Sequence, residues 1–89
     1  MILEKIIEGS GVIAVEGDIR AEITSVCNDS RKAAQGSLFV AVRGFASDGH
    51  SFIATAVRSG AAAVVCEDIE IARREVSEAG IEGVAIVQV

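Results

Sequence analysis

Five consecutive apolar residues, Leu38 to Val42, constrain the fold of this chain more than any other feature. The run is too short for a typical helix, and turn-forming residues bound it on both sides. A continuous apolar run of this length is typical of a strand that is covered on both faces, as strands of parallel sheets are. We therefore expect a buried strand here, with polar loops before and after it.

The sequence after this strand alternates between helix and strand. The expected elements, in order, are a helix over 50–59, a strand over 61–66, a helix over 69–79 and a strand over 84–89. Each helix has one apolar face, formed by Phe52, Ile53, Ala56 and Val57 in the first and by Ile69, Ala72, Val76 and Ala79 in the second. Ser47 or Asp48 can cap the first helix, and Gly60 and Gly80 supply the two stops. Short right-handed crossovers then make the three strands parallel neighbours with helices as covering layers.

The first third of the chain adds smaller elements. Residues 2–8 have the pattern of a short amphipathic helix, and a β-branched segment follows over 12–15. From Ile19 to Ile23 apolar and polar residues alternate, which predicts a half-buried strand. The 89 residues suffice for one small domain. The predicted fold class is α/β, with a small mixed sheet that has a β-α-β-α-β parallel half and helices packed on the sheet.

Composition and missing motifs exclude several functions. A net charge of −5 argues against nucleic acid or an anionic membrane as a partner, and no apolar stretch approaches the length of a membrane span. Cys27 and Cys66 are isolated, so we expect reduced thiols and no metal site. The chain has neither a GxxxxGK[ST] run nor a GxGxxG run, so we expect no ATP hydrolysis by this chain.

The loop after the first buried strand is a candidate binding site. Ligands of open α/β sheets bind outside the carboxyl ends of parallel strands. Arg31, Lys32 and Arg43 lie near this end, and no carboxylate occurs between Asp29 and Asp48. Backbone N–H groups of this glycine-bearing loop could hold an anion. On spacing alone, an ordinary loop with turn glycines is the favoured interpretation.

Two further polar features have a structural and a functional interpretation each. In the segment Asp29-Ser30-Arg31, the Ser30 hydroxyl and the Arg31 guanidinium could contact a ligand. Alternatively, Asp29 and Arg31 pair at the surface of a turn, which contributes ~0–1 kcal/mol. His50 is the only histidine, and a polar residue in the first turn of a helix is favoured over a catalytic one.

An ordered set of motifs resembles the N-terminal domain of the Mur ligases, and most closely their MurE type. The motifs are Asp29-Ser30-Arg31, then Gly36-Ser37-Leu38-Phe39-Val40-Ala41-Val42, then Gly44, then Asp48-Gly49-His50-Ser51-Phe52-Ile53, then Ala56 and Gly60-Ala61-Ala62-Ala63-Val64-Val65. The resemblance is clear over residues 19–66. It implies that residues 1–89 are the domain that holds the UDP end of UDP-MurNAc-L-Ala-D-Glu, and that the ATP-binding and C-terminal domains are absent.

The resemblance also implies an activity and a set of contacts. Such enzymes are cytoplasmic and bacterial, and they use ATP and Mg2+ to add the third peptide residue in peptidoglycan synthesis. The implied substrate-binding residues are Asn28, Ser30, Arg31, Phe45, Ala46 and Ser47, with the first two on the uridine and the last three on the nucleotide and diphosphate. We expect this chain alone to be monomeric and unable to ligate. The alternatives are the MurF-type ligase that adds D-Ala-D-Ala and a stand-alone nucleotide-sugar-binding module.

Overall fold

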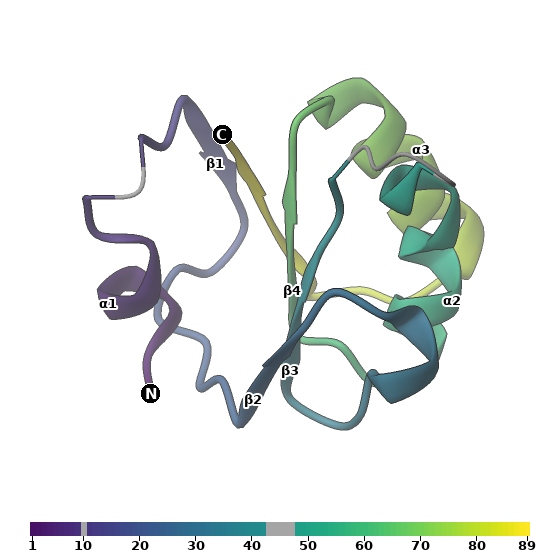
Figure 1. The fold of residues 1–89 in the computed structure, drawn as a ribbon, viewed down its shortest axis with the longest axis horizontal. Helices are drawn as coiled ribbons and strands as arrows, with labels where there is room; N and C mark the ends of the chain where they lie inside the picture. Colours follow the sequence, from purple (N-terminus) through teal and green to yellow (C-terminus); the bar gives the residue numbers. More distant parts are fainter. Residues whose placement is uncertain (10, 43–47) are drawn as a thin grey trace.

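A mixed sheet with the strand order β1-β5-β4-β3-β2 forms the centre of the molecule (Figure 1). The computed structural model describes residues 1–9, 11–42 and 48–89. The strands are β1 (Ala14–Glu16), β2 (Ser25–Cys27), β3 (Ser37–Val40), β4 (Ala63–Cys66) and β5 (Ala85–Gln88). Strands β2 to β5 run parallel, and β1 pairs with β5 in the antiparallel direction. The predicted mixed α/β sheet and its parallel β-α-β-α-β half are confirmed.

The helices lie on both sides of this sheet. They are α1 (Leu3–Ile7), α2 (Ile53–Arg58), α3 (Ile69–Ala79) and two short 3-10 helices, η1 (Ser30–Lys32) and η2 (Gly49–Phe52). Figure 1 shows α2 and α3 together on one side and α1 on the other. Asp48 caps η2 by accepting a hydrogen bond from the His50 N–H, and Gly80 ends α3 in the left-handed conformation, both as predicted. No helix among the described ranges has the length and apolar content needed to cross a bilayer.

The larger core cluster lies between the sheet and the pair α2–α3. Its buried members are Phe39, Ala41, Ile53, Ala56, Val57, Ala61, Val64, Cys66, Ala72 and Ile86. The predicted apolar faces of both helices are therefore confirmed at Ile53, Ala56, Val57 and Ala72. Phe52 is the exception, because it is 42% exposed. It belongs to η2, and α2 with its helical periodicity begins one residue later, so Phe52 does not share the buried face.

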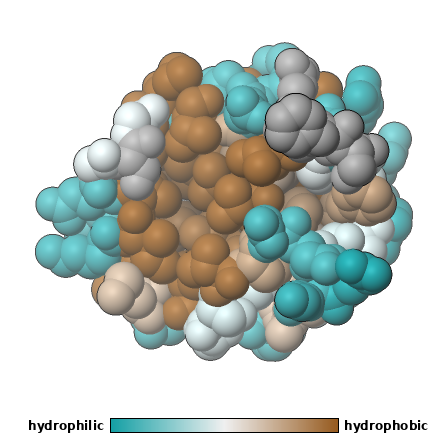
Figure 2. Space-filling model, in the orientation of Figure 1, coloured by the Kyte–Doolittle hydropathy of each residue, from teal (hydrophilic) through white to brown (hydrophobic). Residues whose placement is uncertain are grey.

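The opposite face of the sheet is only partly covered. Its buried cluster contains Leu3, Ile23, Leu38, Ala63, Ala85 and Val87. The helix α1 is five residues long, and two valines stay accessible, Val26 in β2 and Val42 just after β3. The prediction that the apolar run is buried throughout is wrong at Val42, which is 44% exposed. Figure 2 shows an apolar area in the middle of the molecular surface that is turned toward the viewer.

The predicted strand from Ile19 to Ile23 is wrong. Backbone groups of this segment bond instead to the N-terminal residues, with Leu3 N to Ala21 O at 2.9 Å and Ile23 N to Met1 O at 2.8 Å. Ile23 packs into the second core cluster, so the alternation reflects one-sided packing near α1. The strand of this region begins two residues later, at the start of β2.

The two cysteines are free thiols with different surroundings. Cys66 is completely buried in the larger core cluster, whereas Cys27 at the end of β2 is partly exposed. Burial, assisted by the charges of Asp68 and Glu16, raises the pKa of the Cys66 thiol to about 11. Cys66 therefore stays a neutral, apolar core residue at neutral pH.

The tight packing around Gly60 generates a stability prediction. Gly60 has φ +111°, and an added Cβ would lie 2.8 Å from Gln35 Cα, whereas Gly80 has φ +70° and open space around it. We expect Gly80→Ala to cost about 1–2 kcal/mol for the left-handed conformation alone. Gly60→Ala should cost more, because the backbone at Gln35 must also move. Urea unfolding of both variants measures the difference, and equal midpoints would contradict the packing argument.

Candidate functional site

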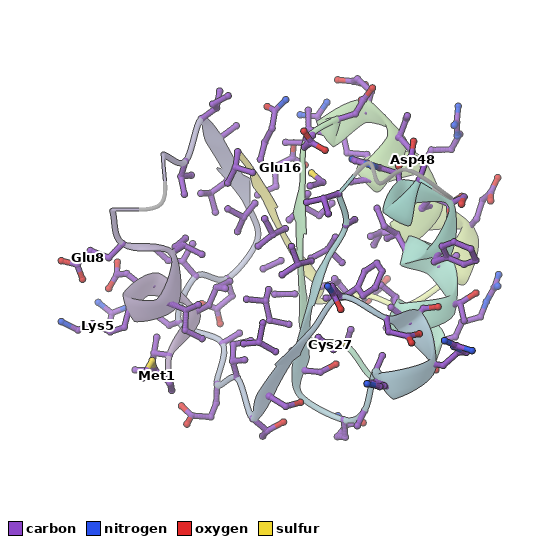
Figure 3. All side chains as sticks on the ribbon, viewed as in Figure 1. Met1, Lys5, Glu8, Glu16, Cys27 and Asp48 are labelled. Carbon is purple, nitrogen blue, oxygen red and sulfur yellow. The ribbon has the colours of Figure 1, made fainter. Side chains whose placement is uncertain are left out.

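A cleft of about 630 Å³ opens where β2 and β3 end. Its walls are Asn28, Asp29, Ser30, Arg31, Phe39, Val40, Val42, Gly49 and Phe52. The two strands are parallel neighbours, so their carboxyl ends meet at one edge of the sheet. In Figure 3, the labelled Cys27 marks the end of β2, and the labelled Asp48 marks the residue before η2. The cleft thus occupies the place that the strand-end rule indicates.

One wall of the cleft is the polar turn that leads into η1. The Asp29 carboxylate accepts hydrogen bonds from the Arg31 N–H at 2.9 Å, from Nε at 3.1 Å and from Nη2 at 2.9 Å. The surface pair that we considered as the structural interpretation of this turn is therefore present. The Arg31 guanidinium holds the pKa of the Asp29 carboxyl down at about 2. The pair is neutral overall, which reduces the local positive charge that the sequence suggested.

Ser30 lies between these two residues and faces the cleft. The residue is only 9% exposed, yet its hydroxyl makes no hydrogen bond to any residue in the described ranges. No completely buried side-chain nitrogen or oxygen among those residues lacks a partner, so the Ser30 oxygen keeps access to the cleft. A hydroxyl both donates and accepts hydrogen bonds. Ser30 is thus a nearly buried polar group that a ligand in the cleft can reach.

The other wall comes from the end of β3 and from η2. The Gly49 N–H donates to Val42 O at 2.9 Å, and a Cβ at Gly49 would lie 2.9 Å from the same oxygen. Only glycine fits this close approach of two backbones. Val42 and Phe52 add apolar surface to the cleft, and Phe39 adds a buried ring. The cleft therefore combines an apolar wall with a polar one.

The buried side chain of His50 connects η2, which forms the second wall, to the residues after β4. Its ring is 1% exposed; Nδ1 lies 2.7 Å from Asp48 Oδ1, and Nε2 accepts the N–H groups of Glu67 at 3.1 Å and Asp68 at 3.0 Å. Because Nε2 accepts two hydrogen bonds, the ring proton sits on Nδ1 and points at Asp48. The prediction of a structural polar residue in the first helical turn is confirmed, although its complete burial was not expected.

The structure brings together the three predicted site residues that it describes. Asn28, Ser30 and Arg31 line the same cleft. Phe45, Ala46 and Ser47, with Arg43 and Gly44, lie outside the described residues. The binding role of all six stays a prediction. Within residues 1–9, 11–42 and 48–89, no group of three side chains could hold a metal ion.

Sequence reasoning missed the apolar wall of the cleft. Val42 was interpreted as part of a buried strand and Phe52 as part of a buried helix face. Strand β3 ends at Val40, so Val42 already belongs to the loop, and Phe52 precedes the first residue of α2. The Asp48-Gly49 pair was the available signal for Phe52. Asp48 caps a first helical turn that begins at Gly49 and ends at Phe52, before α2 begins.

The His50 contacts generate a stability prediction. We expect His50→Ala to lower the free energy of unfolding by about 2–5 kcal/mol, because a completely buried ring is removed and two partly buried N–H groups lose their acceptor. His50→Gln should lose less, since a side-chain amide oxygen can still accept. Urea unfolding followed by circular dichroism compares the two variants. An alanine variant as stable as the unchanged chain would disprove the role of the ring.

The Asp29–Arg31 pair generates a pH prediction. The pKa of Asp29 is lowered from 3.8 to about 2, so its contribution to stability is fully present above pH 3.8. That contribution is lost as the pH falls through about 2. A carboxyl NMR titration should give the low value in the unchanged chain and a higher one in Arg31→Gln, which loses the guanidinium but keeps the backbone N–H bond to Asp29. Titration of Asp29 near 3.8 in the unchanged chain would show that the pair does not persist in solution.

Comparisons with known proteins agree on one family. Residues 22–89 match the family model described as "Mur ligase family, catalytic domain". The chain is 48% identical over 69 residues to the UDP-N-acetylmuramoyl-L-alanyl-D-glutamate--2,6-diaminopimelate ligase of Cytophaga hutchinsonii, covering 78% of this chain and 14% of that protein. It is 50% identical over 68 residues to the protein of the same name from Geobacter sulfurreducens, covering 76% and 13%.

A comparison with solved structures also finds a Mur ligase. MurF from Acinetobacter baumannii superimposes with a TM-score of 0.56 and 28% identity, covering 75% of this chain and 13% of that chain. The chain thus spans about one seventh of the length of the curated relatives that it matches. The family model covers most of the 89 residues, and the fold and the motif order agree with it. The chain therefore belongs to the Mur ligase family.

Proposed function

We propose that this chain is the domain with which a MurE-type ligase holds the UDP end of UDP-MurNAc-L-Ala-D-Glu. One observation carries the proposal: the nearly buried Ser30 hydroxyl faces a strand-end cleft and has no partner among the described residues. Polar side chains that deep are normally hydrogen-bonded, so a ligand that supplies the missing partner fits the site. The names of the relatives, which include UDP-N-acetylmuramoyl-L-alanyl-D-glutamate, support the choice of ligand.

The polar wall suits the parts of a nucleoside diphosphate. The Asn28 amide and the Ser30 hydroxyl can each donate and accept, as the edge of a uracil base and a ribose require. The Arg31 side chain is 87% exposed, and only two of its five guanidinium N–H groups are used by Asp29. The other three can meet a diphosphate oxygen. Phe45, Ala46 and Ser47 complete the proposed site on the diphosphate side, as the family resemblance implies.

The activity that we propose belongs to the whole enzyme. A MurE-type ligase uses ATP and Mg2+ to activate the substrate carboxylate, and an amino acid then attacks to add the third peptide residue. This chain contains no GxxxxGK[ST] run, so the ATP and Mg2+ sites are proposed to lie in other domains. For the whole protein we propose a cytoplasmic bacterial enzyme, and for this domain a monomer.

The degree of similarity favours MurE over MurF. The relatives named as 2,6-diaminopimelate ligases are 43–53% identical to this chain over the aligned residues, compared with 28% for the MurF structure from Acinetobacter baumannii. A stand-alone nucleotide-sugar-binding module would use the same cleft without ligation. An assay for ligation of an amino acid to UDP-MurNAc-L-Ala-D-Glu by the whole protein distinguishes the two: a ligase forms the product, and a binding module does not.

Binding of UDP by the 89-residue chain tests the proposed site. We expect UDP to shift the backbone amide signals of residues 28–31 and 49–52 in an NMR titration, with a Kd near the millimolar range, or about −4 kcal/mol. Ser30→Ala should weaken binding by roughly 0.5–1.5 kcal/mol, one hydrogen bond's worth. Ser77→Ala, which changes an exposed serine on α3, is the matched control and should bind normally. If saturating UDP shifts none of the cleft amides, the proposed site is wrong.

A further inference from the structure

We propose that Phe52 is the platform on which the base of the bound nucleotide stacks, and that it thereby determines the preference of this cleft for nucleotides. This inference rests on the proposed function, because it assumes that the cleft takes a nucleoside diphosphate. It concerns the apolar wall of the cleft, for which the family motifs gave no contact.

The exposure of Phe52 is the first observation. The chain has three phenylalanines and no other aromatic residues apart from His50. Phe39 is 1% exposed and belongs to the core, whereas Phe52 is 42% exposed and lines the cleft beside Val42. Single exposed apolar residues are common on protein surfaces. Two of them in the lining of one cleft, together with the buried ring of Phe39, give the cleft its apolar part.

The surrounding contacts hold the Phe52 backbone in this position. Two residues before it, His50 is buried and hydrogen-bonded at both ring nitrogens, and one residue after it, Ile53 is completely buried. Phe52 thus lies between two anchored neighbours, and Ile53 already occupies the core position of the first helical turn. A residue whose backbone is held in place before the ligand arrives loses less freedom on binding.

The difference between the polar wall and the apolar wall determines which part of the ligand contacts Phe52. A nucleobase has a flat apolar face and a polar edge, while ribose and diphosphate offer hydroxyls and negative charge. Stacking on an aromatic side chain suits only the base, and it tolerates different bases because each has a π-face. The polar groups of the Asn28–Arg31 wall remain for the base edge, the sugar and the phosphates.

Binding measurements with parts of the nucleotide test the inference. The probes are UDP, uridine and inorganic pyrophosphate, added to the 89-residue chain and to the variants Phe52→Ala and Phe52→Leu. The leucine variant keeps an apolar side chain of similar size but has no aromatic face. Ile81→Ala is the matched control, because Ile81 is 45% exposed and lines no part of this cleft. An amide NMR spectrum of each variant confirms that it is folded.

We expect both Phe52 variants to raise the Kd for UDP and uridine about tenfold, which corresponds to about 1.4 kcal/mol. Pyrophosphate binding should not change, and Ile81→Ala should bind all three probes normally. Nuclear Overhauser effects between the Phe52 ring and the uracil protons give a readout that needs no variant.

Two contrary outcomes are distinguishable. If UDP shifts the amides of residues 28–31 but Phe52→Leu binds it normally and no ring contact to uracil is seen, the stacking inference is wrong and the proposed function stands. If UDP shifts no cleft amide in the unchanged chain, the stacking inference and the proposed function are both wrong.

Discussion

The buried imidazole of His50 connects the candidate site to the core. Its Nδ1 side holds the start of η2 through Asp48, and its Nε2 side holds the turn between β4 and α3. The same turn begins α3, because the Asp68 carboxylate caps that helix. One ring therefore joins a wall of the cleft, the end of a central strand and the first turn of the longest helix described. These hydrogen bonds of His50 thus connect one wall of the cleft to the core.

The sheet itself is asymmetric, and this asymmetry shapes the site. Two helices cover one face, whereas the short α1 and Ile23 cover the other face only in part (Figure 1). Apolar residues near the carboxyl ends of the strands, such as Val42, therefore stay accessible. A binding edge of a sheet needs such accessible residues, since complete coverage would close the cleft.

Sequence reasoning succeeded where the signal was local. The apolar runs at β3, β4 and β5 and the helical periodicity of α3 predicted the parallel half of the sheet, because each depends on residues close together in the chain. It failed from Ile19 to Ile23, where the hydrogen-bond partners are Met1 and Leu3, and no local pattern shows that choice. It also failed at Phe52, since one turn of 3-10 helix displaced the start of α2. The motifs placed Ser30 at the site, but its near burial without a partner required the structure.

The pairing of β1 with β5 has a consequence for biosynthesis. In this antiparallel pair Ala14 lies opposite Gln88, so the first strand to leave a ribosome pairs with the last strand described. A ribosome adds about 5–20 residues per second, so roughly 4–14 s pass between the synthesis of the two strands. During that interval β1 has no partner in the sheet, and the apolar surface that β5 will cover is open to solvent. Strand β5 joins β1 to β4, so both of these pairs, and with them the attachment of the first strand to the parallel part of the sheet, form only after translation has passed β5.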